Sequence, residues 1–342
     1  MSSHHIIEPN QINRVHLNHF SPIYEFYHQK LKVDSLKGAR ESTKQYIVSS
    51  VFSAFEDQLT AAEFLYMNDY FDELNQFIAT PPYHQDIKKL YRIVLDRKKT
   101  PLTHKDLDEI KKLSFTHPSL RCMHLFLLVY AHYDVRKYAG MDNYSEDILE
   151  MMYTINEPLF HYYMRLRFDE VTFHHYWKTN HMILAKKFAY KYINAGLAPR
   201  KQLTMNHHLS LCHVFESYEA SMHYVNIALK FAEENKFSKS IEIINNQTIP
   251  FISSFHGKTE KVRTSDPVET AHQAIVKGDY TKAIRILSSI QSPTPYQDSY
   301  LGLAKKDLQL LRKAKDRFVS DYRDLFFAQL PEYYMKRIIK AL

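Results

Sequence analysis

The sequence is divided into short helix-like segments by breaks that recur along the whole chain. Apolar residues follow helical spacing in nearly every segment, whereas strand-like alternation is rare. The best strand candidate is QTIPFISSF (residues 247–255), and its proline weakens it because proline cannot donate to a sheet ladder. Only 6 glycines occur in 342 residues, so glycine-rich phosphate loops and many tight β-turns are not expected. The pattern predicts an all-α protein of short antiparallel helices.

Two of the expected helices have recognisable start signals. Asp266 can cap a helix, Pro267 suits the first turn, and Glu269 follows at the position from which it can reach back. Thr103 with Asp106 is a weaker form of the same signal. Pro22 interrupts the N-terminal region, which shows no compact three-helix pattern with a short glycine-containing turn.

Small and large residues recur at the spacing of tetratricopeptide repeats, in which paired helices cross closely at small side chains. In the clearest unit, residues 266–290, the turn Gly278-Asp279-Tyr280 is followed by Ala283. Further units lie at residues 300–318 (with Leu301-Gly302 and Ala314), at 209–229 and, in degraded form, at 64–78. We therefore predict a right-handed superhelical stack of tetratricopeptide-like helix pairs.

The charge and the cysteine content of the chain indicate a cellular compartment but do not indicate an activity. The formal net charge of +7 is spread along the chain, which permits an acidic partner but does not require one. Cys122 and Cys212 lie in apolar patterns and form no disulfide framework, which suits a reducing cytosol. We find no signal-peptide core and no apolar run of membrane-spanning length. We expect a cytoplasmic protein without a membrane segment.

Several possible catalytic or metal-binding signals fail on spacing. Gly257-Lys258-Thr259 lacks the upstream glycine of a phosphate-binding loop. The pairs His174-His175 and His207-His208 are poor metal sites, because adjacent helical residues point in different directions. Adjacency of Cys212 and His213 does not make a nucleophile–base pair. We expect no enzyme, no catalytic residue, no metal and no cofactor.

Several segments together resemble the arbitrium receptors, the AimR-type lysis–lysogeny regulators of Bacillus phages. The resemblance extends from about Lys37 to the end of the chain, and is carried by residues 208–235 (HLSLCHVFESYEASMHYVNIALKFAEEN), 269–287, 300–334, 88–113 and 156–167. Its C-terminal part includes the aromatic pair Phe326-Phe327 and Leu330-Pro331. At the front the sequence departs from the family, whose members carry an N-terminal helix-turn-helix that reads operator DNA.

This departure divides the chain into two expected parts. Residues 1–36 form an N-terminal segment without a recognisable helix-turn-helix, and residues 37–342 form the helical repeat domain with C-terminal dimerisation helices. Because base-specific contact needs a helix presented to the major groove, we expect weak, salt-sensitive DNA binding at most.

The resemblance implies an intracellular receptor for a short communication peptide that regulates the phage lysis–lysogeny decision as a homodimer in the host cytoplasm. An extended peptide brings unpaired backbone groups and two charged termini, which Asn, Arg and acidic side chains can hold. The candidate peptide-binding residues are Arg165, Asp169, His174, Asn206 and Ser210. Arg165 and Asp169 are four residues apart and share a helix face, whereas Arg165 and Arg167 cannot both face one groove.

An alternative function stays open at this point. A tetratricopeptide-type regulator of the Rap-like kind would act on a protein partner without binding DNA. A chain that lacks the DNA-reading domain could also pair with a full-length receptor or titrate its peptide.

Overall fold

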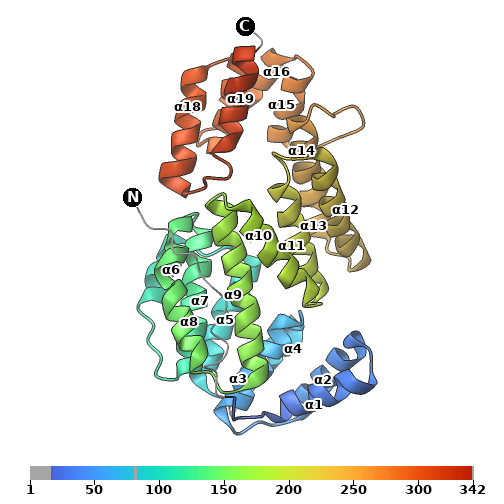
Figure 1. The fold of residues 1–342 in the computed structure, drawn as a ribbon, viewed down its shortest axis with the longest axis vertical. Helices are drawn as coiled ribbons and strands as arrows, with labels where there is room; N and C mark the ends of the chain where they lie inside the picture. The colour runs from blue at the N-terminus through green and yellow to red at the C-terminus, as the bar shows by residue number, and fades with distance from the viewer. Residues whose placement is uncertain (1–16, 81–82, 341–342) are drawn as a thin grey trace. The chain divides into compact units, whose positions relative to one another are not determined.

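The computed structural model describes residues 17–80 and 83–340, and these are folded into helices and connecting turns with no strand among them (Figure 1). The all-α prediction is therefore confirmed. The chain divides into two compact units. The first contains the chain up to Val135 together with Gly140–Phe168, and the second contains Arg136–Ala139 and everything from Asp169 onward.

The first unit is built from eight helices and the first half of a ninth. They are α1 (Pro22–Val33), α2 (Leu36–Ser49), α3 (Phe55–Met67), α4 (Phe71–Ala79), α5 (Gln85–Lys99), α6 (His104–Lys111), α7 (Pro118–Asp134), α8 (Ser145–Tyr153) and the start of α9 (Pro158–Lys178). Helix α3 is buried on every side from Asp57 to Met67, as expected of the central helix of a unit.

The second unit begins within α9 and continues to the C-terminus. Its further helices are α10 (Met182–Asn194), α11 (Pro199–Cys212), α12 (Tyr218–Glu234), α13 (Ser238–Ile243), α14 (Ile249–Phe255), α15 (Pro267–Val276), α16 (Tyr280–Ser288), α17 (Pro295–Lys305), α18 (Leu308–Arg317) and α19 (Gln329–Lys340). Two π-helical turns, Ile244–Thr248 and Phe318–Tyr322, interrupt the regular pattern. Such turns are rare and are often found next to functional sites.

The helix pairs lie where the repeat pattern predicts them. Gly278 takes the left-handed conformation (φ +81°) in the turn between α15 and α16, and Ala283 is fully buried. Between α17 and α18 the approach is close, because a Cβ atom on Gly302 would lie 2.8 Å from Leu311 Cγ. Ala314 is also fully buried. The small residues therefore lie at close helix crossings.

The two capping predictions have different outcomes. Thr103 and Asp106 form a complete capping box at the start of α6. Asp266 caps α15 by accepting from the backbone N–H groups of Val268 and Glu269, as expected. The Glu269 side chain, however, does not reach back to the cap; it accepts from the Tyr300 hydroxyl at 3.2 Å and contacts His272.

Pro250 and Pro22, both singled out in the sequence, lie at helix starts. The strand candidate at residues 247–255 is helical: Pro250 lies in the first turn of α14, and residues 250–255 are all buried. A short apolar run fits a buried helix as well as a strand, and a first-turn proline has no N–H to satisfy. Pro22 likewise begins α1, whose N-terminus Ser21 caps through Tyr24 N, and does not interrupt a helix.

The proposed N-terminal segment, residues 1–36, falls partly outside the described residues, which begin at 17. Within the described part, α1 is joined by Asp34 and Ser35 to α2, which begins at Leu36. The boundary between residues 36 and 37 therefore lies at the start of a helix.

Candidate functional site

The second half of α9 and the neighbouring α11 carry four of the five predicted site residues. Asp169 and His174 lie on α9, and Asn206 and Ser210 lie on α11, all within the second unit. Arg165 lies in the first unit, where its side chain is partly exposed. The residues therefore lie on the expected helices, but Arg165 belongs to the first unit and the other four belong to the second.

Asp169 is almost fully buried, with 2% of its surface exposed. Its Oδ1 accepts from Lys191 Nζ on α10 at 2.6 Å, and the Lys191 side chain is 39% exposed. A buried carboxylate needs such a partner, because desolvating an unpaired charge is costly. Since Lys191 is long and partly in solvent, a ligand cation could replace it without leaving the carboxylate unpaired.

His174 contacts the aromatic side chains that link α9 to α11. Its ring centroid is 4.8 Å from that of His208 in an edge-on arrangement, and the Trp177 ring lies 5.4 Å from His208. We call His174, Trp177 and His208 the α9–α11 cluster. From the C-terminal segment, Phe326 and Phe327 pack against Trp177 at 6.0 and 6.1 Å. The aromatic pair noted in the sequence therefore forms part of the surroundings of this cluster.

Asn206 and Ser210 are buried and bond to their own helix. Asn206 Nδ2 donates to the Gln202 carbonyl at 2.8 Å, and the Ser210 hydroxyl donates to the His207 carbonyl at 2.7 Å. Each lies two positions, about 200° of helix rotation, from His208, so they face a different side of α11. The Asn206 side chain has a second N–H and a carbonyl oxygen beyond this one bond.

Three polar atoms in this region are buried without a hydrogen-bond partner among the described residues. They are Thr172 Oγ1 and Trp177 Nε1 on α9 and His208 Nδ1 on α11. Buried polar atoms are normally paired, and each unpaired one costs about 1–3 kcal/mol. A polar ligand that reached these atoms would supply the missing bonds.

His207 and His208 are neutral at physiological pH. Burial lowers the pKa of His208 well below its usual range, and the nearby His174, His207 and Lys178 lower it further. Burial also lowers the pKa of His207 to about 4. His207 Nε2 lies 2.7 Å from the Thr248 hydroxyl, in the first π-helical turn. Such a weakly basic imidazole is a poor general base at neutral pH, so this pair favours positioning over catalysis.

The adjacent histidines diverge as predicted, because His207 contacts Thr248 while His208 contacts His174 and Trp177. Within residues 17–80 and 83–340 no three His, Cys, Asp or Glu side chains are grouped so as to hold a metal ion. Cys212 is fully buried, and burial raises the pKa of its thiol well above the usual range. The thiol is therefore protonated, which makes it a poor nucleophile.

The end of α9 is fixed by a buried ion pair to the C-terminal segment. Lys178 Nζ donates to Asp324 Oδ2 at 2.7 Å, and both side chains are at most 5% exposed. Leu325 N also donates to the Lys178 carbonyl at 2.8 Å. Arg323, just after the second π-helical turn, takes a left-handed conformation (φ +55°) that precedes this contact. The segment thereby holds Phe326 and Phe327 against Trp177.

Sequence reasoning missed several of these residues. Trp177 could have been found, because it lies three positions from His174 and so shares its helix face. Lys191 and Asp324 could not, since they reach α9 from segments 22 and 146 residues away from their partners. Only the fold brings them together.

The sequence profile of the family described as AimR transcriptional regulator-like matches residues 40–337. The chain belongs to this family. It is also 24% identical over 260 residues to an uncharacterised protein of Bacillus anthracis, an alignment that covers 69% of this chain and 91% of the relative. The AimR-type resemblance seen in the sequence is thus confirmed.

Solved AimR structures have the same fold. A ligand complex of phAimR superposes with a TM-score of 0.74 at 15% identity, covering 95% of this chain and 99% of that one. The structure of selenomethionine phAimR gives a TM-score of 0.64 at 14% identity, covering 95% and 87%. None of the helices described in residues 17–80 and 83–340 combines the length and apolarity needed to span a bilayer.

Proposed function

We propose that this AimR-family protein is an intracellular receptor for a short communication peptide and regulates a phage lysis–lysogeny decision. The family assignment supports a regulatory role, and the likeness to a ligand complex of phAimR supports a fold able to hold a ligand. The observation that carries the proposal is the set of unpartnered buried polar atoms at Thr172, Trp177 and His208.

A peptide backbone matches these atoms in chemistry. The Trp177 N–H can only donate, so it would bond to a peptide carbonyl, while the Thr172 hydroxyl and the neutral His208 ring can donate or accept. The rings of the α9–α11 cluster would pack against apolar peptide side chains. Binding would therefore convert unsatisfied groups into paired ones, which is the type of gain that makes a buried polar site selective.

The predicted residues have distinct roles in this proposal. Asp169 would hold a peptide cation, either a basic side chain or the terminal amine, in exchange for Lys191. Asn206 and Ser210, on the other side of α11 from His208, would serve the peptide backbone, and His174 would contact the peptide from the α9–α11 cluster. Arg165 is proposed to hold a carboxylate of the peptide.

We propose a homodimer formed through the C-terminal helices, acting in the cytoplasm of the host cell, with residues 1–36 as a reduced N-terminal segment and residues 37–342 as the peptide-sensing body. It would act on a protein partner or on a full-length receptor.

A thermal-shift screen of the full chain against short synthetic peptides tests this function. The peptides are overlapping segments encoded by any short reading frame found next to the gene, with a scrambled version of each as control. A peptide present at 100 times its dissociation constant stabilises the folded state by about 2.7 kcal/mol, which raises the melting temperature by several degrees. No shift with any segment, or equal shifts with the scrambled peptides, would contradict the proposal.

A further inference from the structure

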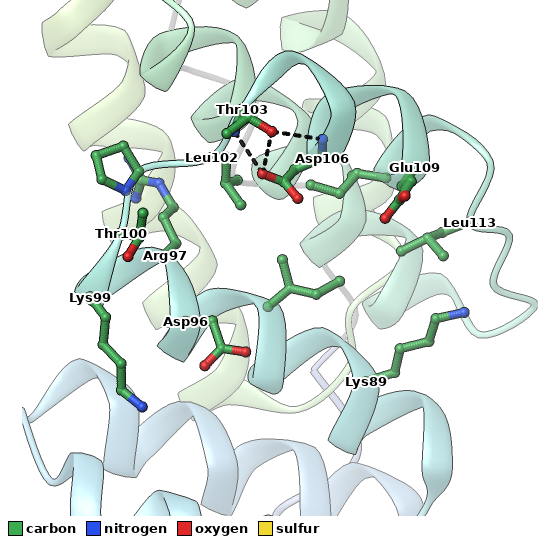
Figure 2. Close-up of a pocket in the computed structure, with 13 residues that line it drawn as sticks. Lys89, Asp96, Arg97, Lys99, Thr100, Leu102, Thr103, Asp106, Glu109 and Leu113 are labelled. Carbon is green, nitrogen blue, oxygen red and sulfur yellow. Dashed lines mark hydrogen bonds between the residues drawn. The ribbon is translucent and has the colours of Figure 1, made fainter.

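A cavity of about 520 Å³ opens on the first unit, between α5 and α6 and far along the chain from the α9–α11 cluster (Figure 2). Its floor is apolar and is made by Ile93, Leu102, Ile110 and Leu113. This volume lies within the ~300–1,000 Å³ typical of sites that bind ligands.

The walls of this cavity are held by contacts that leave its interior open. Arg97 donates to both carboxylate oxygens of Asp134 on α7, at 2.8 and 2.9 Å. Asp134 Oδ2 also accepts from Leu102 N at 3.0 Å, which fixes the loop between α5 and α6. At the far end, His124 Nε2 lies 2.8 Å from the Ile110 carbonyl. A wall fixed in advance reduces the ordering cost of binding.

The charges around the cavity are divided between its two sides. On α5, Lys89 and Lys99 lie at opposite ends with Asp96 between them, while α6 contributes Asp106 and Glu109 (Figure 2). Lys89, Lys99 and Asp96 form no ion pair with the residues that the structure describes. Asp106 is held by the backbone and hydroxyl of Thr103, both at 2.7 Å, which lower the pKa of its carboxyl. On α6, Lys105 Nζ lies 3.9 Å from Glu109 Oε1 with both side chains mostly exposed, so Asp106 and Glu109 supply the acidic groups of this side while the α5 side is cationic at both ends.

We propose that this cavity docks an amphipathic helix of a protein partner. Its apolar stripe enters the cavity, acidic residues on one flank pair with Lys89 and Lys99, and basic residues on the other flank pair with Asp106 and Glu109. Lys89 and Lys99 are ten positions apart on α5, about 15 Å, so acidic residues about three turns apart on the partner helix face both. This inference does not depend on the proposed peptide function.

A helix fits better than an extended segment because of the floor. The four floor side chains offer no polar atoms, and an extended segment lying on them would bury unpaired backbone groups. A helix satisfies its own backbone and presents only side chains, which is the helix-in-groove mode of recognition. The surface thus gives a physical basis for the alternative role expected from the sequence, action on a protein partner.

The test uses two capped synthetic helices of about 20 residues, because isolated helices shorter than ~12–15 residues are marginal in water. Both carry the same leucine stripe. The matched probe has Glu on one flank and Lys on the other, and the basic probe has Lys on both. Affinities for the full-length protein are measured by fluorescence polarisation. We expect the parent protein to bind the matched probe about ten-fold more tightly than the basic probe.

The decisive variant is Lys89→Glu/Lys99→Glu, which should bind the basic probe more tightly than the matched probe. Its matched control is Lys111→Glu/Lys112→Glu, which changes the net charge equally but lies outside the cavity lining and should keep the parent order. Leu113→Glu, checked for folding by circular dichroism, should abolish binding of the matched probe.

Three outcomes would overturn the proposal. The first is no binding of the matched probe at about 1 mM. The second is an unchanged order of the probes in the Lys89→Glu/Lys99→Glu variant. The third is a dimer that Leu113→Glu breaks while neither probe binds, which would make the occupant a second copy of this chain.

Discussion

Arg167 donates from Nε and Nη2 to the two carboxylate oxygens of Glu63, at 2.7 and 3.0 Å, inside the first unit. Both side chains are at most 1% exposed, and the Tyr91 and Tyr130 hydroxyls complete the network. Arg165, two positions earlier on α9, is partly exposed. The prediction that these two arginines face different surroundings is therefore confirmed.

Removing one partner of this buried pair should be strongly destabilising. Arg167→Ala leaves the Glu63 carboxylate buried without its cation, and we expect it to lower the free energy of unfolding by about 3–5 kcal/mol. Arg165→Ala is the matched control and should cost less than about 1 kcal/mol. Urea denaturation followed by circular dichroism measures both. Equal losses of unfolding free energy in the two variants would show that the buried Arg167 contributes no more to stability than the partly exposed Arg165.

The close helix crossings predict sensitivity to added volume. Ala283→Leu and Ala314→Leu, at fully buried positions, should each lower the free energy of unfolding by about 1–3 kcal/mol because the facing helix must shift. The exposed neighbours serve as controls, so Lys282→Leu and Lys313→Leu should have little effect. Melting temperatures report the difference, and unchanged values for both alanine variants would mean that the assigned crossings are wrong.

Stability should fall on mild acidification because of the buried histidines. The pKa of His207 is lowered to about 4 in the folded state, below its usual value, so the unfolded chain binds more protons between those two values. The free energy of unfolding therefore decreases as the pH falls through that range, by up to about 1.4 kcal/mol per pH unit for each such histidine. His207→Gln should give a shallower dependence, while exposed His104→Gln should retain the parent slope. An identical slope in His207→Gln and the parent would contradict the assignment.

DNA binding is expected to be weak and to disappear with salt. The excess of basic residues is spread along the chain, and such binding depends on phosphate contacts and counterion release. Electrophoretic mobility assays with competitor DNA at about 0.15 M salt should show no specific complex. Nanomolar binding to one operator sequence would show that the N-terminal helices read DNA after all.

The fold was largely predictable because its signals are local. Helical spacing, the start signals at Thr103 and Asp266, and small residues such as Ala283 depend on neighbours within one or two helices. The short buried apolar run around Pro250 carries no period that separates a helix from a strand, so only the fold assigns it to a helix.

The candidate site was less predictable, because its chemistry comes from distant segments. Sequence placed Asp169 and His174 on one helix but could not supply Lys191, His208 as a ring partner, or the C-terminal residues that fix Lys178. It also gave no sign that Asn206 and Ser210 bond within their own helix. Whether these five predicted residues bind a ligand stays a prediction.

The most direct test of the account is isothermal titration of the cognate peptide into the parent protein and into Asp169→Ala, Asn206→Ala and Trp177→Phe, each checked for intact folding. His174→Ala, Ser210→Ala and Arg165→Ala complete the set, and the exposed Lys239→Ala is the control. Losing a buried charge-paired contact costs about 2–5 kcal/mol, so Asp169→Ala should weaken binding about thirty-fold or more. Trp177→Phe, which removes the ring N–H together with part of the indole ring, should weaken it by about ten-fold. If Asp169→Ala, Asn206→Ala and Trp177→Phe all bind like the parent, the peptide does not bind at α9 and α11.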